Sequence, residues 1–170
     1  MTQRTDGTGI VVGVDGSDAS RAALRWAARQ ARALGTDVLA VCAWEPAPAH
    51  AAPYAPVTGR PTLAQQRERA AELLADSVHE VFGPRVDPAV HAVLAEGPPA
   101  RVLLRHTHGA LLLALGRGTH DRGDLPALGP VSRECLRHAT VPVVTVPAPH
   151  SAEPRLRAVG TAGRVASGVA

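Results

Sequence analysis

The stretch IVVGVDGSDASRAALRWAARQARALG, residues 10–35, decides the fold class of this chain. It begins with a continuous apolar run, which is typical of a strand buried on both faces of a sheet. Asp15-Gly16-Ser17 then predicts a tight turn, in which Ser17 is a suitable N-cap for the helix that follows. Gly35 is a typical residue for ending that helix. The stretch therefore predicts a strand, a turn and a helix in direct succession.

The remaining apolar runs continue the same alternation. Strands are predicted at 38–43, 90–94, 111–115 and 141–146, and helices at 62–82, 98–105 and 130–138. Strict alternation of strands and helices indicates an α/β fold, a parallel sheet with helices on both of its faces.

We expect one domain, at 8–148, with a Pro- and Ala-rich loop at 46–61 inside it. Residues 149–170 are small, polar and aperiodic, so we expect them to form a mobile tail.

The basic residues of the chain are all arginine, and the net charge is only +3. A nucleic-acid-binding protein concentrates basic residues on one face beside stacking aromatics, whereas here aromatics make up 2% and the arginines are spread out. We therefore expect no nucleic-acid partner. Four arginines recur every three or four residues on one face of the first helix: Arg21, Arg25, Arg29 and Arg32. We expect this face to be solvated, with contact to an acidic partner as the alternative.

The cysteines and the N-terminal residues bear on the compartment. Cys42 and Cys135 have neither metal-site nor redox-motif spacing, which favours two free, buried thiols in a reducing compartment. The N-terminus lacks the apolar stretch of a signal peptide, and no run approaches the roughly 20 apolar residues of a membrane span. We expect a cytoplasmic protein that does not enter a membrane.

Two segments carry residues suited to a ligand site. Asp15 follows the first strand and Gly116 follows the fourth, so both face one crevice if these strands are neighbours in the sheet. A carboxylate can hold a ribose hydroxyl, and a Gly-rich turn lets the backbone approach phosphates. The helix that begins near Pro130 directs its free N–H groups toward the same loop. The pattern predicts a nucleotide site.

At these positions the sequence resembles the universal stress protein family. IVVGVDGSDASRAALRWAARQA resembles the first strand, aspartate and first helix of the family, and LLLALGRGTHDRGDLPALGPVSRECLRHATVPVVTVP resembles its closing half. The resemblance covers about residues 10–147. It implies a five-stranded sheet, dimers and, in many members, bound ATP with Mg²⁺. Together with the alternation it predicts the strand order 3-2-1-4-5.

The phosphate motif that the resemblance implies is only partly present. ATP-binding members carry Gly, two residues, Gly, nine residues, Gly, and then Ser or Thr. Gly116 and Gly129 match the first and third glycines, whereas Thr119 stands at the second and Pro130 at the hydroxyl position. Each lost charge-assisted hydrogen bond costs about 1.5–3 kcal/mol, so two losses weaken binding by roughly a hundredfold or more. We expect weak binding of ATP.

The resemblance also distributes the parts of a bound nucleotide over this sequence. Adenine is expected near Gly13 and Cys42, and ribose near Asp15 and Gly116. The residues expected near the phosphates are Thr119, Gly129, Val131 and Ser132.

The expected function is that of a stress-response regulator and not of an enzyme. No acid–base pair or metal set requires catalysis, and Ser132, His138 and Asp121 lack the nucleophile elbow that would support a catalytic triad. Slow hydrolysis of ATP stays an alternative, for which no residue identifies a base. The second alternative is a nucleotide-free dimeric adaptor of the same family.

The last strand predicts how copies of the chain assemble. Residues 141–146 carry no charge, and an exposed edge strand of this kind invites pairing with a second chain. Universal stress proteins often dimerise through this strand. We expect a homodimer centred on Val143, Val144 and Thr145, with a monomer whose tail covers the edge as the alternative.

Overall fold

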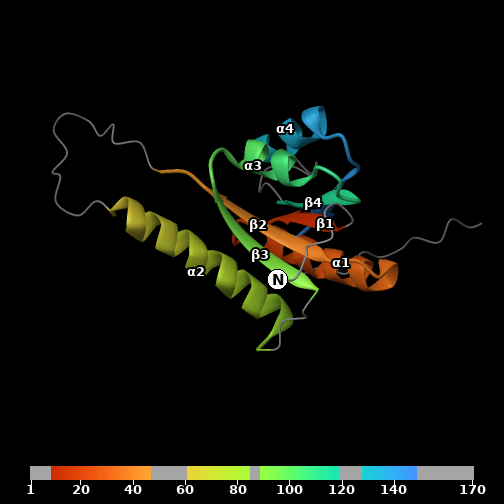
Figure 1. The fold of residues 1–170 in the computed structure, drawn as a ribbon, viewed down its shortest axis with the longest axis horizontal. Coiled ribbons are helices and arrows are strands. Elements are labelled where there is room, and N and C mark those ends of the chain that lie inside the picture. The colour runs from red at the N-terminus through yellow and green to blue at the C-terminus, as the bar shows by residue number, and fades with distance from the viewer. Residues whose placement is uncertain (1–8, 47–60, 85–88, 119–127, 149–170) are drawn as a thin grey trace, which may run out of the picture.

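The computed structural model describes residues 9–46, 61–84, 89–118 and 128–148. Most of the predicted loop at 46–61 and all of the predicted tail at 149–170 lie outside the described residues. Strands and helices alternate along the described chain, as Figure 1 shows. In order they are β1 (Ile10–Gly13), α1 (Asp18–Leu34), β2 (Val38–Trp44), α2 (Leu63–Phe82), β3 (Val90–Glu96), α3 (Pro99–His106), β4 (Leu112–Arg117), α4 (Pro130–His138) and β5 (Val143–Pro147).

The strands form one parallel sheet in the order β3-β2-β1-β4-β5, which confirms the predicted fold and strand order. β1 lies at the centre of the sheet, because β2 and β3 are added on one side of it and β4 and β5 on the other. Val12 of β1 is level with Ala40 of β2 and with Ala114 of β4. The carboxyl ends of these three strands therefore meet at one edge, where the strand order reverses.

The core consists of two layers of small aliphatic side chains, one on each face of the sheet. Alternate residues of the strands point to opposite faces, so Ile10 and Val12 pack beneath α1 and α2, and Val11 packs beneath α3 and α4. In Figure 1, α1 and α2 lie below the sheet and α3 and α4 lie above it. Helices thus cover both faces, as the alternation predicts.

The helix ends follow the local signals of the sequence. Ser17 caps α1, since its Oγ accepts a hydrogen bond from the amide of Ser20 at 3.1 Å. Gly35 ends the same helix in the left-handed region, at φ 65°. Thr62 and Gln65 form a reciprocal capping box at the start of α2. These contacts determine where α1 and α2 begin. The cap at Ser17 also orders the turn that precedes α1.

The bounds of β2, β3, β4 and β5 differ from the prediction by one to two residues at one or both ends, and the largest differences are in β4 and β5. β4 continues to Arg117, because Arg117 is in register with Pro147 at the end of β5. β5 begins at Val143 and not at residue 141, since Pro142 has no N–H to donate to the ladder and only its carbonyl oxygen accepts, from the amide of Leu113 at 2.9 Å.

The expectation of a solvated arginine face on α1 is wrong for Arg21. The Arg21 side chain is only 20% exposed, and its Nε lies 3.2 Å from Glu80 Oε2 of α2. Arg25, one turn further on, reaches the other oxygen of Glu80 at 3.8 Å and stays 44% exposed. The acidic partner of these arginines is therefore a residue of the same chain, on the helix that packs beside α1.

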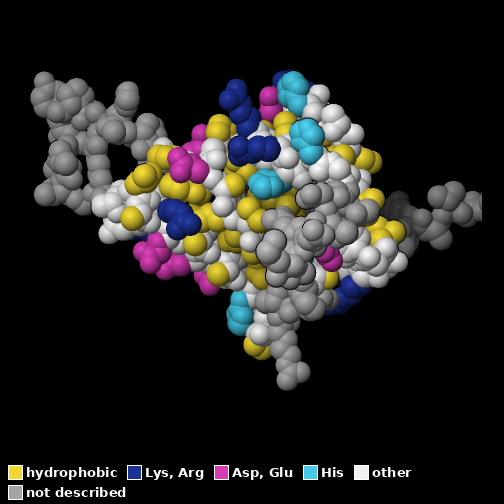
Figure 2. Space-filling view, viewed as in Figure 1, with side chains coloured by type: hydrophobic (Ala, Val, Ile, Leu, Met, Phe, Trp, Pro, Cys, Tyr) yellow, Lys and Arg dark blue, Asp and Glu magenta, His cyan; other side chains and the backbone are white. Residues whose placement is uncertain are grey.

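Arg25, Arg29 and Arg32 of α1 are exposed, as expected, and further exposed arginines lie on other described elements. Figure 2 shows arginine and histidine side chains gathered mostly over α3 and α4, and acidic ones mostly on the side of α2.

None of the described helices combines the length and the apolar character needed to cross a membrane.

Candidate functional site

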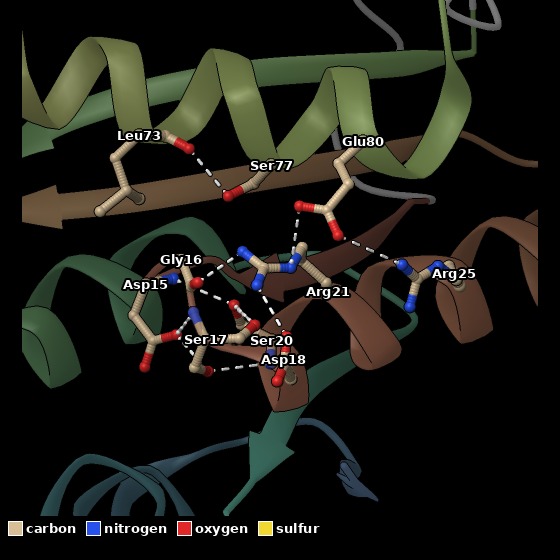
Figure 3. A network of polar contacts seen from close by, with 10 residues as sticks. All are labelled: Asp15, Gly16, Ser17, Asp18, Ser20, Arg21, Arg25, Leu73, Ser77 and Glu80. Carbon is tan, nitrogen blue, oxygen red and sulfur yellow. Dashed lines mark hydrogen bonds and ion pairs between the residues drawn. The ribbon is translucent and has the colours of Figure 1, made fainter. Parts of the chain in front are cut away.

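The turn between β1 and α1 presents a carboxylate at the edge where the strand order reverses. Asp15 Oδ1 accepts hydrogen bonds from the amide of Ser17 at 3.0 Å and from its hydroxyl at 2.6 Å. Figure 3 shows the second oxygen of Asp15 turned away from the turn. No described residue donates a hydrogen bond to that oxygen. One half of the carboxylate thus holds the turn, and the other half is available to a ligand hydroxyl.

The charge state of Asp15 follows from the same contacts. Neighbouring protein atoms displace water and raise the pKa of this carboxyl, but the hydrogen bonds from the side chain and amide of Ser17 are the main effects in the other direction, and the pKa is lowered overall. Asp15 is therefore a carboxylate throughout the neutral range. It is also an exposed side chain, so a ligand can reach it.

Gly16, which the sequence analysis treated only as part of a tight turn, is held against α2. Its φ is +79°, a conformation that L side chains rarely adopt. A Cβ placed on it would lie 3.0 Å from Cδ1 of Leu73. Helix α2 therefore closes one side of the turn that carries Asp15.

The two residues expected beside adenine lie on opposite faces of the sheet. Cys42 is 4% exposed, and its thiol points toward α2, with Sγ 3.9 Å from the carbonyl oxygen of Ala70. Burial, and then the charge of Asp15, raise the pKa of this thiol. A Cβ on Gly13 would lie 2.9 Å from Leu115 Cδ2 and 3.2 Å from Leu103 Cδ1. Only the main chain of these two residues is left to face a ligand at the sheet edge.

Gly116 lies at the end of β4 and packs tightly against α1. A Cβ at this position would stand 2.5 Å from the amide nitrogen of Ser20 and 2.7 Å from the carbonyl oxygen of Ala19. Since both are backbone atoms, they have little freedom to move aside. The sequence predicts a glycine here for the approach of a phosphate, and the contact of β4 with the start of α1 is a second reason for it.

The start of α4 carries the described part of the predicted phosphate site. Gly129 is the N-cap, Pro130 occupies the first helical position, and no described atom lies within 4 Å of a Cβ placed on Gly129. The first bond of the helix joins the amide of Arg133 to the carbonyl of Gly129. The amides of Val131 and Ser132 precede that bond, so they have no acceptor within the helix.

The side chains of Val131 and Ser132 point into the protein. Val131 packs on the core layer beneath α3 and α4, and Ser132 is 7% exposed. Thr119, also expected beside phosphates, lies outside the described residues.

The described residues also line a hollow of about 260 Å³ at the opposite edge of the sheet. Its walls come from the end of α1 and the beginnings of β2 and β3. This hollow is separate from the edge that carries Asp15. The described side chains form no group of three or more His, Cys, Asp or Glu that could hold a metal ion.

Fold and site together define a class: an open parallel α/β sheet with a carboxylate and helix amides at its switch point, the usual place for a nucleotide or a similar ligand in such sheets. A sequence model of the universal stress protein family matches residues 8–147. The chain therefore belongs to the universal stress protein family.

Curated relatives agree with this assignment. A universal stress protein of Mycobacterium tuberculosis is 31% identical over 153 residues, a match that covers 86% of this chain and 50% of that protein. A universal stress protein of Thermus aquaticus is 30% identical over 143 residues, covering 81% of this chain and 96% of that protein. The chain thus spans about half the length of the mycobacterial relatives it matches.

Solved structures show the same fold. The universal stress protein UspA from Lactobacillus plantarum superposes with a TM-score of 0.62 at 21% identity, covering 84% of this chain and 99% of that one. A universal stress protein from Archaeoglobus fulgidus, solved in complex with dAMP, gives a TM-score of 0.56 at 22% identity, covering 82% and 97%.

Proposed function

We propose that this chain is a non-catalytic universal stress protein that binds an adenine nucleotide, with ATP as the ligand, and acts in the cytoplasm. The observation that carries the proposal is the free oxygen of Asp15 at the switch point of the sheet, on a turn that is already ordered by Ser17. The nucleotide complexes of structural neighbours, one with dAMP and one with cAMP, support adenine as the base. Two free, buried cysteines agree with a reducing compartment.

In this proposal each part of the nucleotide meets a different element. The free oxygen of Asp15 accepts a ribose hydroxyl, beside the main chain of Gly116. Adenine lies against the main chain at Gly13 and Cys42.

The phosphates reach the start of α4. The residues proposed beside them are Thr119, Gly129, Val131 and Ser132. Because Pro130 supplies neither an amide nor a hydroxyl there, the affinity is low. We propose Mg²⁺ together with ATP, because in nucleotide sites this ion is bound by phosphate oxygens, waters and one or two carboxylates.

The first test asks whether nucleotide is present in the protein as purified. The protein is denatured and the supernatant is chromatographed for adenine nucleotides. Calorimetry with ATP then compares the wild type with Asp15→Asn, which removes the charged acceptor. We expect Asp15→Asn to weaken binding about tenfold, the value of one hydrogen bond to a charged group.

The matched control for this test is Asp37→Asn. Asp37 is an exposed carboxylate near the amino end of β2, away from the switch point. It should leave the affinity for ATP unchanged. Equal affinity of the wild type and Asp15→Asn would refute the assignment of Asp15.

A second candidate function is a nucleotide-free adaptor of the same family. It is favoured by Pro130 at the first position of α4 and by Gly116, whose packing against α1 is a sufficient reason for that glycine without a ligand. Purified protein that contains no nucleotide and gives no heat with ATP would support the adaptor.

We also propose that the protein is a homodimer paired through β5. The strand lies at an edge of the sheet, its valines are half-buried, and residues 141–146 carry no charge. The proposed contacts centre on Val143, Val144 and Thr145. A two-fold axis would pair the strand antiparallel to its copy and satisfy the main-chain groups of both.

A further inference from the structure

Arg21 connects the turn that carries Asp15 to a helix from another part of the chain. Its Nη1 donates a hydrogen bond to the carbonyl oxygen of Gly16 at 2.6 Å. Its Nη2 donates to Asp18 Oδ1 at 2.7 Å, and its Nε lies 3.2 Å from Glu80 Oε2 on α2. Figure 3 shows the guanidinium between these three acceptors. Two nitrogens thus donate hydrogen bonds to the turn and the start of α1, and the third, Nε, makes an ion-pair contact with α2.

The carbonyl that Arg21 holds belongs to the residue next to Asp15. Gly16 is in the left-handed conformation and is pressed against Leu73 of α2 from the other side. A small rotation of the Gly16 peptide would turn Asp15 and release its bonds with Ser17. The turn is therefore fixed from two directions, by Leu73 and by Arg21, and both depend on α2 being in place.

Arg25 provides an internal comparison. It lies one helical turn after Arg21 and reaches the same carboxylate, Glu80, at 3.8 Å. The described structure gives it no bond to the Gly16 carbonyl. Two arginines therefore join α1 to α2, but only Arg21 also holds the turn.

We infer that Arg21 is a positioning residue for the nucleotide site: through the Gly16 carbonyl it orients Asp15, and through Glu80 it makes the affinity of the site depend on how α2 docks. The inference rests on the proposed binding of nucleotide at Asp15. Displacement of the last turns of α2, for instance by a protein partner, would loosen the Asp15 turn and release the ligand. Helix α2 is suited to this role, since only Leu74, Ser77 and Val78 of its residues are buried.

The first experiment measures the affinity for ATP by calorimetry in four proteins: wild type, Arg21→Gln, Arg21→Lys and Arg25→Gln. Arg21→Gln should weaken binding about fivefold to tenfold, because Asp15 loses its fixed orientation. Arg21→Lys should keep the ion pair with Glu80 but not all three contacts. Its affinity for ATP should therefore lie between that of the wild type and that of Arg21→Gln. Arg25→Gln should stay within about twofold of the wild type. Equal losses in Arg21→Gln and Arg25→Gln would overturn the inference.

A double-mutant cycle then tests whether Arg21 acts through Asp15. In an Asp15→Asn background, Arg21→Gln should change the affinity less than about twofold, since the group that it positions is gone. A loss as large as in the wild-type background would mean that Arg21 acts on the ligand by another route, and would overturn the inference.

A nucleotide-free measurement separates this inference from the proposed function. Hydrogen exchange followed by NMR reports on the Ser17 amide, which donates to Asp15 Oδ1. In Arg21→Gln this amide should exchange about tenfold faster than in the wild type. In Arg25→Gln, and at Ala27 in the middle of α1 in both variants, exchange should be unchanged.

The outcomes of the two kinds of experiment are distinct. If the wild type binds no ATP but the Ser17 amide responds to Arg21→Gln alone, the proposed function fails and the structural link from Arg21 to the Asp15 turn stands. If the Ser17 amide does not respond, or if all amides of α1 respond together, the positioning role of Arg21 is overturned whether or not ATP binds.

Discussion

At the scale of single residues, Asp15 combines a structural and a ligand-binding capacity in one carboxylate. Oδ1 accepts both hydrogen bonds from Ser17 and fixes the turn, while the other oxygen faces outward. The bonds from Ser17 stabilise the charged form and lower its pKa. The residue is therefore rigid and ionised before any ligand arrives, which reduces the ordering cost of binding.

The lowered pKa predicts how stability depends on pH. A carboxylate with a folded-state pKa below the unfolded value of 3.8 stabilises the fold at higher pH, and that contribution is lost as the pH falls through the folded-state value. The difference in unfolding free energy between wild type and Asp15→Asn, measured by urea denaturation, should therefore shrink as the pH is lowered from 7 to about 3. In a Ser17→Ala background the pH dependence should be smaller, because the hydroxyl donor is gone and only the amide of residue 17 still donates to Asp15 Oδ1. A difference that stays constant across this range would contradict the assignment.

Gly116 gives a second prediction at the residue scale. Gly116→Ala places a methyl group against the backbone of Ala19 and Ser20, and overpacking of this kind costs about 1–3 kcal/mol. Urea denaturation measures that loss. Gly118→Ala is the matched control, since no described atom lies within 4 Å of its Cβ position, and it should stay within about 0.5 kcal/mol of the wild type. Equal stability of the two variants would mean that β4 and α1 are less closely packed than described.

At the scale of elements, the start of α4 differs from the phosphate motif that the family resemblance implies. The helix begins with Pro130, so its first turn offers the amides of Val131 and Ser132 but no amide or hydroxyl at the first position. Proline fits that position sterically because its fixed φ is helical. Pro130 is therefore compatible with a stable α4, but it leaves the start of the helix with fewer hydrogen-bond donors for a phosphate.

Restoring the family pattern tests this point directly. Thr119→Gly combined with Pro130→Ser should tighten the binding of ATP at least about tenfold, since even one recovered bond to a charged phosphate has that value. Calorimetry measures the gain. Pro142→Ser, before β5, is the control that replaces a proline away from the site and should change nothing. No gain in the double variant would favour the adaptor function.

At the scale of the whole molecule, the sheet has two edges with different surroundings. β3 carries His91 and Glu96, while β5 has no charged residue. Exposed charges on an edge strand discourage pairing with other chains. The distribution therefore favours β5 over β3 as the strand of the proposed dimer interface.

Val144→Lys tests the proposed dimer. Val144 belongs to neither core layer, so a lysine there should disturb pairing more than folding. We expect sedimentation at micromolar concentration to give a dimer for the wild type and a monomer for Val144→Lys, with unchanged circular dichroism. Ala92→Lys, at an exposed position of β3, should remain a dimer. A monomeric wild type would end the proposal, and a dimeric Val144→Lys would remove this interface.

The sequence by itself determined the elements and their order. The buried run at 10–13, the caps at Ser17, Gly35 and Thr62, and the alternation of strands and helices depend on local chemistry, which a single segment carries within itself. The position of Asp15 at the switch point followed from that alternation together with the family resemblance.

Only the tertiary structure decided which residues of these elements contact one another. Arg21 looked like one of four equivalent arginines, because spacing along a helix does not reveal which neighbouring helix carries Glu80. Gly116 looked like a phosphate glycine, because its contact with α1 joins residues about a hundred positions apart. The direction of the Cys42 thiol depends on α2 in the same way. Contacts between distant segments have no local signal, since the free energy that selects them comes from packing the whole core at once.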